Sequence, residues 1–237
     1  MTNHRRYLVI LSGVYLVVWL ALAIKPYHRD DWALENILVV VAVVVLGSTY
    51  RTFPLSNISY TLIFLFLCLH AVGAHFTYSE VPYRDWMSSM GLPVDLDGRN
   101  HFDRFVHFSY GLLLAYPVRE VFIRVATVRG FWGYFLPLDV TMSTSMLYEL
   151  VEWGAAVVLG GELGALYLGT QGDVWDAHWD MALASLGALI AMAVTMIINS
   201  AIQRDFAQEW ADSLRIRRPE PLGEFSIRRL LRESKER

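Results

Sequence analysis

The sequence predicts an all-α protein, a polytopic membrane helix bundle of about six transmembrane helices, from its hydropathy and from the pattern of its apolar residues. Hydrophobic residues make up 55% of the 237 residues, and the mean hydropathy is +0.37. Ordinary soluble domains are less apolar than this. Apolar runs such as ILVVVAVVVLG are continuous and do not alternate as half-buried strands would. Six segments approach the roughly 20 residues with which a helix crosses a hydrocarbon core of roughly 30 Å.

The first three predicted helices are cleanly apolar. The first covers 7–24 and follows Arg5 and Arg6, as the apolar region of a secretory signal would. It is longer than a usual signal region and no small-residue cleavage pattern follows it, so we expect a retained helix. The second and third are expected at 34–50 and 58–76.

The last three predicted helices cover 102–118, 138–160 and 179–202. The fourth and fifth reach the required length but contain ionisable residues, whereas the sixth is cleanly apolar. We therefore expect a six-helix transmembrane domain over 1–202, followed by a basic cytoplasmic tail over 203–237. The tail composition fits two alternatives, a short amphipathic helix on anionic lipid or a solvated segment that fixes the topology.

The distribution of Lys and Arg predicts the orientation, because cytoplasmic segments of membrane proteins carry an excess of these residues. With both termini inside, fifteen of the 20 Lys and Arg lie in cytoplasmic pieces. The outer pieces then hold Lys25, Arg29, Arg84, Arg99 and Arg104. We expect a multi-pass protein of the bacterial inner membrane with both termini in the cytoplasm.

Ionisable residues gather where the last three helices meet the outer surface. The stretch HFDRFVHFSY opens the fourth helix and places Asp103, His107 and Tyr110 on one face, at spacings of four and seven. In the fifth helix Glu149 and Glu152 lie one turn apart. Three aspartates recur at intervals of three and four as the sixth helix begins: Asp173, Asp176 and Asp180.

These residues predict a polar site with surplus negative charge. Six carboxylates and three histidines, His101, His107 and His178, converge near only two arginines, Arg99 and Arg104. Charged groups at membrane depth cost roughly 2.5 kcal/mol or more each, so they pair, protonate or bind cations. The cluster therefore holds protons or recruits a cation.

A divalent metal (Zn, Mn or Mg) satisfies this requirement most directly. We expect four metal ligands: Asp103, His107, Glu149 and Asp176. Glu152 and Asp180 are the expected catalytic carboxylates. Five further residues are expected to line the site: His101, Arg104, Tyr110, Asp173 and His178. The single cysteine, Cys68, excludes an intrachain disulfide and disfavours a thiolate metal site.

Each part of this cluster also has a structural interpretation. His70 and His75 in the third helix either add imidazoles to the site or are hydrogen-bonded core residues. Asp173 either joins the site or caps the sixth helix. Arg99 and Arg104 either bind a ligand or tie down the acids as salt bridges. We favour a ligand or catalytic site over a purely structural network because intramembrane ionisable groups are usually functional.

Three motifs resemble those of the YjdF-like bacterial inner-membrane proteins, a family whose function is not established: RNHFDRFVHFSYGLLLAYPVRE, YELVEWGAA and YLGTQGDVWDAHWDMALASLGAL. The resemblance extends from about the first to the sixth predicted helix and implies an inner-membrane location. A more distant pattern is similar to the VanZ-like membrane proteins, some of which are linked to glycopeptide antibiotic tolerance. It consists of Asp103-x-x-x-His107-Phe108-x-Tyr110, Glu149-x-x-Glu152 and Asp176-x-x-x-Asp180 with Gly187. Glu152 and Asp180 stand where VanZ-like chains usually have Gln and Asn, which makes this site more acidic.

Three functions remain open at this stage. The first is a metal-dependent hydrolase or transferase that acts on a lipid or envelope substrate, with Glu152 as general base. The second is a non-catalytic binding or stress-tolerance module, VanZ-like, that captures a cationic or amphiphilic ligand. The third is proton or cation transport, which the lack of an ionisable relay to the cytoplasm disfavours. We expect membrane lipid and a lipid-linked or envelope ligand as partners and no nucleic acid; the oligomeric state stays open.

Overall fold

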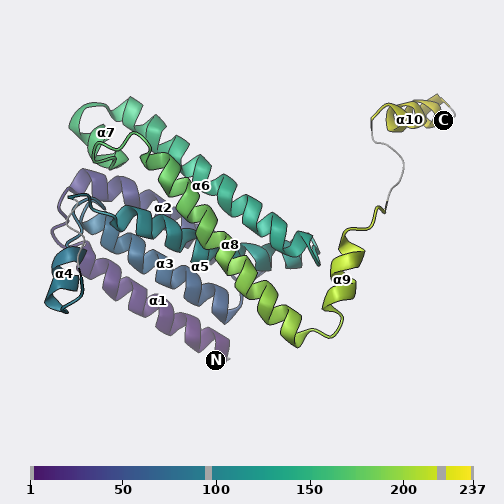
Figure 1. Ribbon diagram of the computed structural model, residues 1–237, viewed down its shortest axis with the longest axis horizontal. Coiled ribbons are helices and arrows are strands. Elements are labelled where there is room, and N and C mark those ends of the chain that lie inside the picture. The colour runs from purple at the N-terminus through teal and green to yellow at the C-terminus, as the bar shows by residue number, and fades with distance from the viewer. Residues whose placement is uncertain (1–2, 94–97, 218–222, 236–237) are drawn as a thin grey trace.

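The computed structural model describes residues 3–93, 98–217 and 223–235 (Figure 1). Within these residues the chain forms ten α-helices and no strand. The six long helices are α1 (Asn3–Leu22), α2 (Arg29–Thr49), α3 (Asn57–His75), α5 (Phe102–Val125), α6 (Trp132–Leu159) and α8 (Asp176–Ile202). The four short ones are α4 (Tyr83–Ser89), α7 (Gly161–Leu168), α9 (Phe206–Ser213) and α10 (Glu224–Lys235). The predicted all-α bundle is confirmed.

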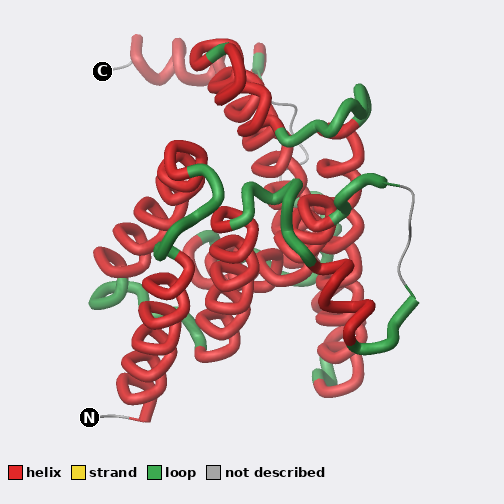
Figure 2. The backbone as a smooth tube through the Cα atoms, turned by 90° about the vertical axis from the view of Figure 1, so that its left-hand side faces the viewer, coloured by secondary structure: helices red, strands yellow, loops and turns green. Residues whose placement is uncertain are grey.

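Four of the described helices, α1, α2, α3 and α8, are long and apolar enough to cross a membrane by length and composition. The 24-residue α5 and the 28-residue α6 are as long but carry more polar and charged residues. They pack against α8 and lie within the same bundle (Figures 1 and 2). The six-span count therefore stays a prediction for these two helices.

Helices α5 and α6 extend beyond their predicted bounds. The apolar runs predicted that the fourth helix ends at 118 and the fifth begins at 138, whereas α5 continues to Val125 and α6 begins at Trp132. Pro117 and Pro137 lie inside these continuous helices. A proline removes one backbone hydrogen bond of a helix. The helix continues where packing against neighbouring helices compensates for that loss.

The centre of the bundle is the contact between α5 and α8. A Cβ atom added at Gly111 of α5 would overlap the backbone of Ala184, and one added at Gly187 of α8 would overlap the backbone of Phe108. Small residues of this kind let two membrane helices approach backbone to backbone. Helix α5 also packs against α3 and α6 and is therefore surrounded by the bundle. This contact fixes the relative positions of the polar residues that α5 and α8 carry.

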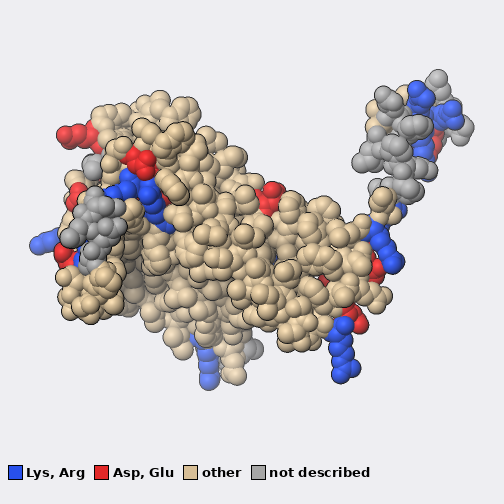
Figure 3. Space-filling view, in the orientation of Figure 1, with Lys and Arg blue, Asp and Glu red and all other residues tan. Residues whose placement is uncertain are grey.

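The two ends of the bundle differ in what covers them. Helices α4 and α7 and the loops before α5 and α8 lie at one end, called here the α7 end (Figure 1). At the opposite end, the α9 end, Trp210 of α9 packs against Phe131 and Tyr134. The Glu209 side chain accepts a hydrogen bond from the Gly130 N–H at 3.0 Å. Charged side chains gather mainly at these two ends, and the surface between them is largely uncharged (Figure 3).

Candidate functional site

The centre of the site is His107, a buried residue in the second turn of α5. Its Nε2 atom lies 3.6 Å from Oδ1 of Asp103 on the same helix and 3.6 Å from Oε1 of Glu149 on α6. Asp103 and His107 are four residues apart and therefore share one face, as the sequence predicts. His107 and Glu149 are both buried. The structure thus brings α5 and α6 together through one imidazole between two carboxylates.

Helix α8 adds Asp180 to this group. One ligand atom each from Asp103, His107 and Asp180 can be chosen so that all three lie within 4.8 Å of one another. Asp180 is buried, and its Oδ1 atom has no hydrogen-bond partner within the described part of the chain. A buried carboxylate oxygen without a partner is costly, so it indicates a missing proton or cation.

Two arginines form ion pairs with Asp173 and Asp176, the two acids that precede Asp180 in the chain. Arg99 donates to Asp176, and Arg104 Nη2 lies 2.6 Å from Oδ2 of Asp173 and 3.5 Å from Oδ1 of Asp176. The N–H of Trp175 also donates to Asp173 at 2.9 Å. That backbone hydrogen bond and, after it, Arg104 lower the pKa of Asp173. These contacts form an ion-paired rim, defined here as Arg99, Arg104, Asp173 and Asp176.

The loops before α5 and α8 are joined directly at this rim. The Asn100 N–H donates to Oε1 of Gln171 at 2.8 Å, and Nε2 of Gln171 returns a bond to the Asn100 carbonyl at 2.9 Å. Arg99 Nη1 donates to the Thr170 carbonyl at 2.6 Å. Because this pairing is reciprocal, it fixes the register of the two loops. The arrangement holds the first turns of α5 and α8 side by side.

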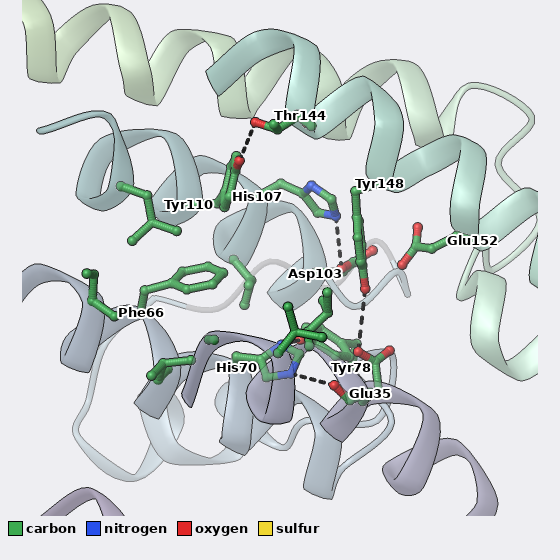
Figure 4. A pocket seen from close by; sticks show the side chains of 18 of the residues that line it. Glu35, Phe66, His70, Tyr78, Asp103, His107, Tyr110, Thr144, Tyr148 and Glu152 are labelled. Carbon is green, nitrogen blue, oxygen red and sulfur yellow. Dashed lines mark hydrogen bonds and ion pairs between the residues drawn. The ribbon is translucent and has the colours of Figure 1, made fainter. Parts of the chain in front are cut away.

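A cavity of about 500 Å³ lies next to His107. Its walls come from α2, α3, α5 and α6, and α7 lines it near the α7 end. Figure 4 shows Asp103, His107, Tyr148 and Glu152 directed toward this space, with Glu35, His70 and Tyr78 on the opposite side. Toward the α9 end the lining becomes apolar. The cavity is therefore polar at one end and hydrocarbon-like at the other.

Comparisons with known proteins place this bundle in a family. Residues 7–201 match the model of the family described as "Predicted membrane protein (DUF2238)". The chain belongs to this family. It is also 39% identical over 171 residues to the inner membrane protein YjdF of Escherichia coli (strain K12), an alignment that covers 70% of this chain and 78% of that protein. No solved structure matches the chain.

The expected resemblance to YjdF-like proteins is thereby confirmed, and this DUF2238 protein is an integral membrane protein. Its match covers α1 to α8 nearly completely, so it includes every residue of the cluster around His107. Neither comparison assigns a reaction or a ligand. The function has to be argued from the side chains.

The structure separates the predicted site residues into three groups. Asp103, His107, Glu149 and Asp180 meet at the bundle centre, whereas Asp173, Asp176 and Arg104 form the rim. Glu152 and Tyr110 line the cavity, and the Tyr110 hydroxyl lies 2.6 Å from that of Thr144.

The predicted histidines other than His107 lie elsewhere. His178 is exposed and its ring contacts Trp175, because a position two residues after Asp176 lies about 200° around the helix. His101 is the N-cap residue of α5, and its N–H donates to the Tyr83 hydroxyl at 3.2 Å. The structure does not bring either ring to the central cluster.

The structure decides between the two interpretations of His70 and His75. Nε2 of His70 lies 3.0 Å from the Glu35 carbonyl, and its Nδ1 accepts the Tyr78 hydroxyl at 2.5 Å. Nδ1 of His75 lies 2.7 Å from the Leu22 carbonyl. Both side chains therefore tie α3 to neighbouring segments as hydrogen-bonded core residues.

Helix α2 supplies two acids to the cavity that the sequence analysis missed. Asp31 and Glu35 are buried and line the cavity from the wall opposite α6. The Tyr148 hydroxyl lies 3.5 Å from Oε2 of Glu35. Oδ1 of Asp31 has no hydrogen-bond partner among the described residues. Their spacing of four, at the start of an apolar run, is the sequence signal that could have identified them.

Tyr78 is held in the cavity wall by a turn with unfavourable backbone angles. Thr77 and Tyr78 both have positive φ angles, 55° and 43°, which are rare for residues other than glycine and exceptional for a β-branched threonine. The turn folds the Tyr78 ring back over Gly73, where a Cβ atom would overlap it. Burial holds the pKa of the Tyr78 phenol well above its usual range. Such strain persists where the surroundings enforce it, commonly at functional sites.

Proposed function

We propose that this protein is a divalent-metal-dependent hydrolase or transferase that acts on a lipid or envelope substrate. The observation that carries the proposal is the convergence of Asp103, His107 and Asp180, whose ligand atoms lie within 4.8 Å of one another. The buried, unpartnered Oδ1 of Asp180 is independent support. A cation bound here would remove the free-energy cost of burying that oxygen without a partner. It would also balance the negative charge of the surrounding carboxylates.

The donor set suits zinc or manganese better than magnesium. It combines two carboxylates with one imidazole, whereas magnesium prefers oxygen ligands alone. Zinc binds oxygen and nitrogen at about 2.0–2.2 Å, so two ligand atoms on one ion lie at most about 4.4 Å apart. Small side-chain adjustments bring the three atoms within that limit. Glu149, 3.6 Å from His107, is the nearest candidate for a fourth ligand.

The geometry favours an exchange of roles between two aspartates of α8. The sequence suggested Asp176 as a ligand and Asp180 as a catalytic carboxylate. Asp176 is paired with Arg99 and Arg104, whereas Asp180 faces Asp103 and His107. We therefore assign Asp180 to the metal and Asp176 to the rim that positions α8.

Glu152 is the proposed general base. It lines the same cavity as Asp103, His107 and Tyr148, so a substrate in the cavity would be in reach of Glu152 and of two proposed ligands (Figure 4). A bound divalent metal would supply a polarised water or substrate oxygen at this place. The Glu152 carboxylate would then be the group that accepts a proton there.

We place the α7 end, and with it the site, on the extracytoplasmic side of the inner membrane. The support is the excess of Lys and Arg in the segments at the α9 end and in the tail. Both termini are then cytoplasmic, and 203–237 forms the proposed basic tail beyond the membrane domain of 1–202.

Metal analysis of the purified full-length protein tests the proposal. After exposure to zinc or manganese and removal of excess metal, we expect about one equivalent bound to the wild type. Asp180→Asn should weaken binding at least about tenfold, since loss of one ligand removes charge and coordination together. Asp173→Asn makes the same change at a partly exposed rim residue and should retain the metal. A wild type that binds neither metal would remove the proposal.

A second candidate is capture of a cationic or amphiphilic ligand without turnover. It is favoured by the cavity lining, which contains four carboxylates and, among the described residues that form it, no Lys or Arg. A chelator distinguishes the two, because it abolishes a metal-dependent reaction but leaves metal-independent capture intact. Transport is disfavoured by the apolar lining toward the α9 end, where Leu46, Leu114 and Val118 offer no ionisable group.

A further inference from the structure

We propose that the cavity binds an amphiphile with a cationic, ammonium-type head and a single hydrocarbon tail, and that this molecule enters sideways from the bilayer. The inference names the substrate class for the proposed function and rests on it for the reaction, although the binding itself can be measured without metal. Three observations support it: the chemistry of the polar end, the shape of the apolar end, and the exposure of one wall.

The polar end has the chemistry of a cation site. Glu35 of α2 lies across the cavity from Glu152 of α6 (Figure 4), and Asp31 of α2 lines the same cavity. Oδ1 of Asp31 is buried and lacks a hydrogen-bond partner among the described residues, as does the hydroxyl of Ser145. Buried acids that no Lys or Arg among the described residues pairs with favour a positively charged ligand and oppose an anionic one.

The head site and the proposed metal site are adjacent but use different acids. Asp180 of α8 and Glu149 of α6 contact or approach His107 and are not among the residues that line the cavity, whereas Asp31 and Glu35 line it from α2. The two sets of carboxylates are numerous enough to hold one metal ion and one ammonium group. A bound head would therefore lie next to the metal without replacing it.

The remainder of the cavity has the shape of a tail site. Its lining from Asp103 to Val118 of α5 spans sixteen residues, or about 22 Å along the helix, from the α7 end toward the α9 end. The other walls of this part are apolar residues of α2 and α3, including Leu38, Ala42 and Ile63. The volume of about 500 Å³ lies within the usual range for small-molecule pockets.

The cavity is open on the side of α2 that faces the lipid. Leu38, Val41 and Val45 line it and are nevertheless 44%, 53% and 52% exposed. They lie on one face of α2 at spacings of three and seven. Thr144 of α6, also exposed, lines the opposite side. Because these positions lie in the membrane-spanning parts of the helices, the opening meets hydrocarbon and admits a lipid-like molecule directly.

Photolabelling of the full-length protein in phosphatidylcholine nanodiscs tests this inference. The probe is dodecylamine with a diazirine in its tail, and labelled residues are located by mass spectrometry. We expect labels at 38–46 of α2 and 114–118 of α5. Unlabelled dodecylamine should displace the probe at least about tenfold more effectively than dodecanol or dodecyl phosphate, a difference of about 1.4 kcal/mol.

Matched variants test the head site, the tail site and nonspecific labelling separately. Glu35→Gln should weaken competition by dodecylamine about tenfold, because one carboxylate charge is lost. Ala42→Trp fills the tail site and should abolish labelling of α5. Val43→Trp is adjacent on α2, is exposed and does not line the cavity, so labelling should persist. Ile63→Trp repeats the tail test from α3 in case Ala42→Trp fails to fold.

The outcomes distinguish this inference from the proposed function. Equal displacement by dodecyl phosphate would overturn the cationic head, and unchanged labelling of both filled variants would overturn the tail site. Asp180→Asn should lose metal yet retain labelling, since Asp180 does not line the cavity. A wild type that is labelled as expected but binds no metal would leave the amphiphile site in place and remove the metal-dependent reaction.

Discussion

Asp176 and Asp180 illustrate how neighbours determine the chemistry of one residue type. They lie four positions apart on the same face of α8, and both are buried. Asp176 contacts Arg99 of the loop before α5 and Arg104 in the first turn of α5, whereas Asp180, one turn deeper, lies against Asp103 and His107. Asp176 therefore has two arginine partners, and no salt bridge joins Asp180 to a Lys or Arg among the described residues.

Tyr78→Phe tests the contribution of the buried Tyr78 hydroxyl to stability, and this contribution has a defined pH dependence. Loss of the hydroxyl leaves Nδ1 of buried His70 without its donor, so we expect a cost of about 1–2 kcal/mol at neutral pH. Burial raises the pKa of Tyr78. An unfolded tyrosine ionises near pH 10, so this phenol contributes stability fully below about pH 10 and loses it as pH rises further.

The corresponding measurement is the melting temperature in detergent as a function of pH. We expect the wild-type curve to fall more steeply above about pH 10 than the Tyr78→Phe curve. Tyr27→Phe removes an exposed hydroxyl and should follow the wild type. Parallel curves for wild type and Tyr78→Phe would contradict the assigned role of burial.

At the residue scale, the sequence predicted the acids on α5, α6 and α8 because helical spacing alone places them at one end. Asp103, His107, Glu149 and Asp180 were expected to converge, and they do lie together. Glu35 was missed although it lies inside the predicted 34–50 helix, because Asp31, the acid four residues before it, lies outside the start of that apolar run. Ion pairs such as Arg99 with Asp176 were not predictable, because they depend on how the loops before α5 and α8 pair with each other.

At the scale of elements, the α5–α8 contact gives a sharp prediction. Gly111→Ala places a methyl group against the backbone of Ala184, so the helices must separate. Overpacking of this kind typically costs about 1–3 kcal/mol, and we expect a lower melting temperature. Because Asp103, His107 and Asp180 span this contact, the variant should also bind metal more weakly.

Gly154→Ala is the matched control for this substitution. An added Cβ at Gly154 of α6 meets no atom within 4 Å, so the change should be neutral or slightly stabilising, as alanine favours the helix. If Gly111→Ala melted at the same temperature as Gly154→Ala, close packing at the crossing would not be required for stability.

The existence of the long helices was predictable, but their ends and the short helices were not. Apolar length identified all six long helices approximately. It ended the fourth at 118, because the charged residues Arg119, Glu120 and Arg124 follow, although α5 continues to Val125. Helices α4 and α7 have seven and eight residues, too few for a periodic pattern to stand out. Their positions depend on tertiary packing against α2, α3 and α6.

At the scale of the whole molecule, the orientation is testable by cysteine labelling. In a Cys68→Ser background, Ser88→Cys in α4 and Arg215→Cys after α9 place single thiols on exposed positions at opposite ends of the bundle. If both termini are cytoplasmic, an impermeant maleimide should label only Ser88→Cys in cells with a permeabilised outer membrane. Labelling of Arg215→Cys alone would reverse the orientation and place the site inside.

The backbone contact between α5 and α8 also determines which part of the bundle can move. Where α5 and α8 meet at Gly111 and Gly187, no side chain lies between the backbones that could repack. We therefore expect the two helices to move together as one rigid unit. The far wall, α2, is anchored mainly through α3 and α7. Any widening of the cavity that admits a ligand must therefore come from displacement of α2. The proposed metal ligands Asp103, His107 and Asp180 lie on α5 and α8 and keep their relative positions during that movement.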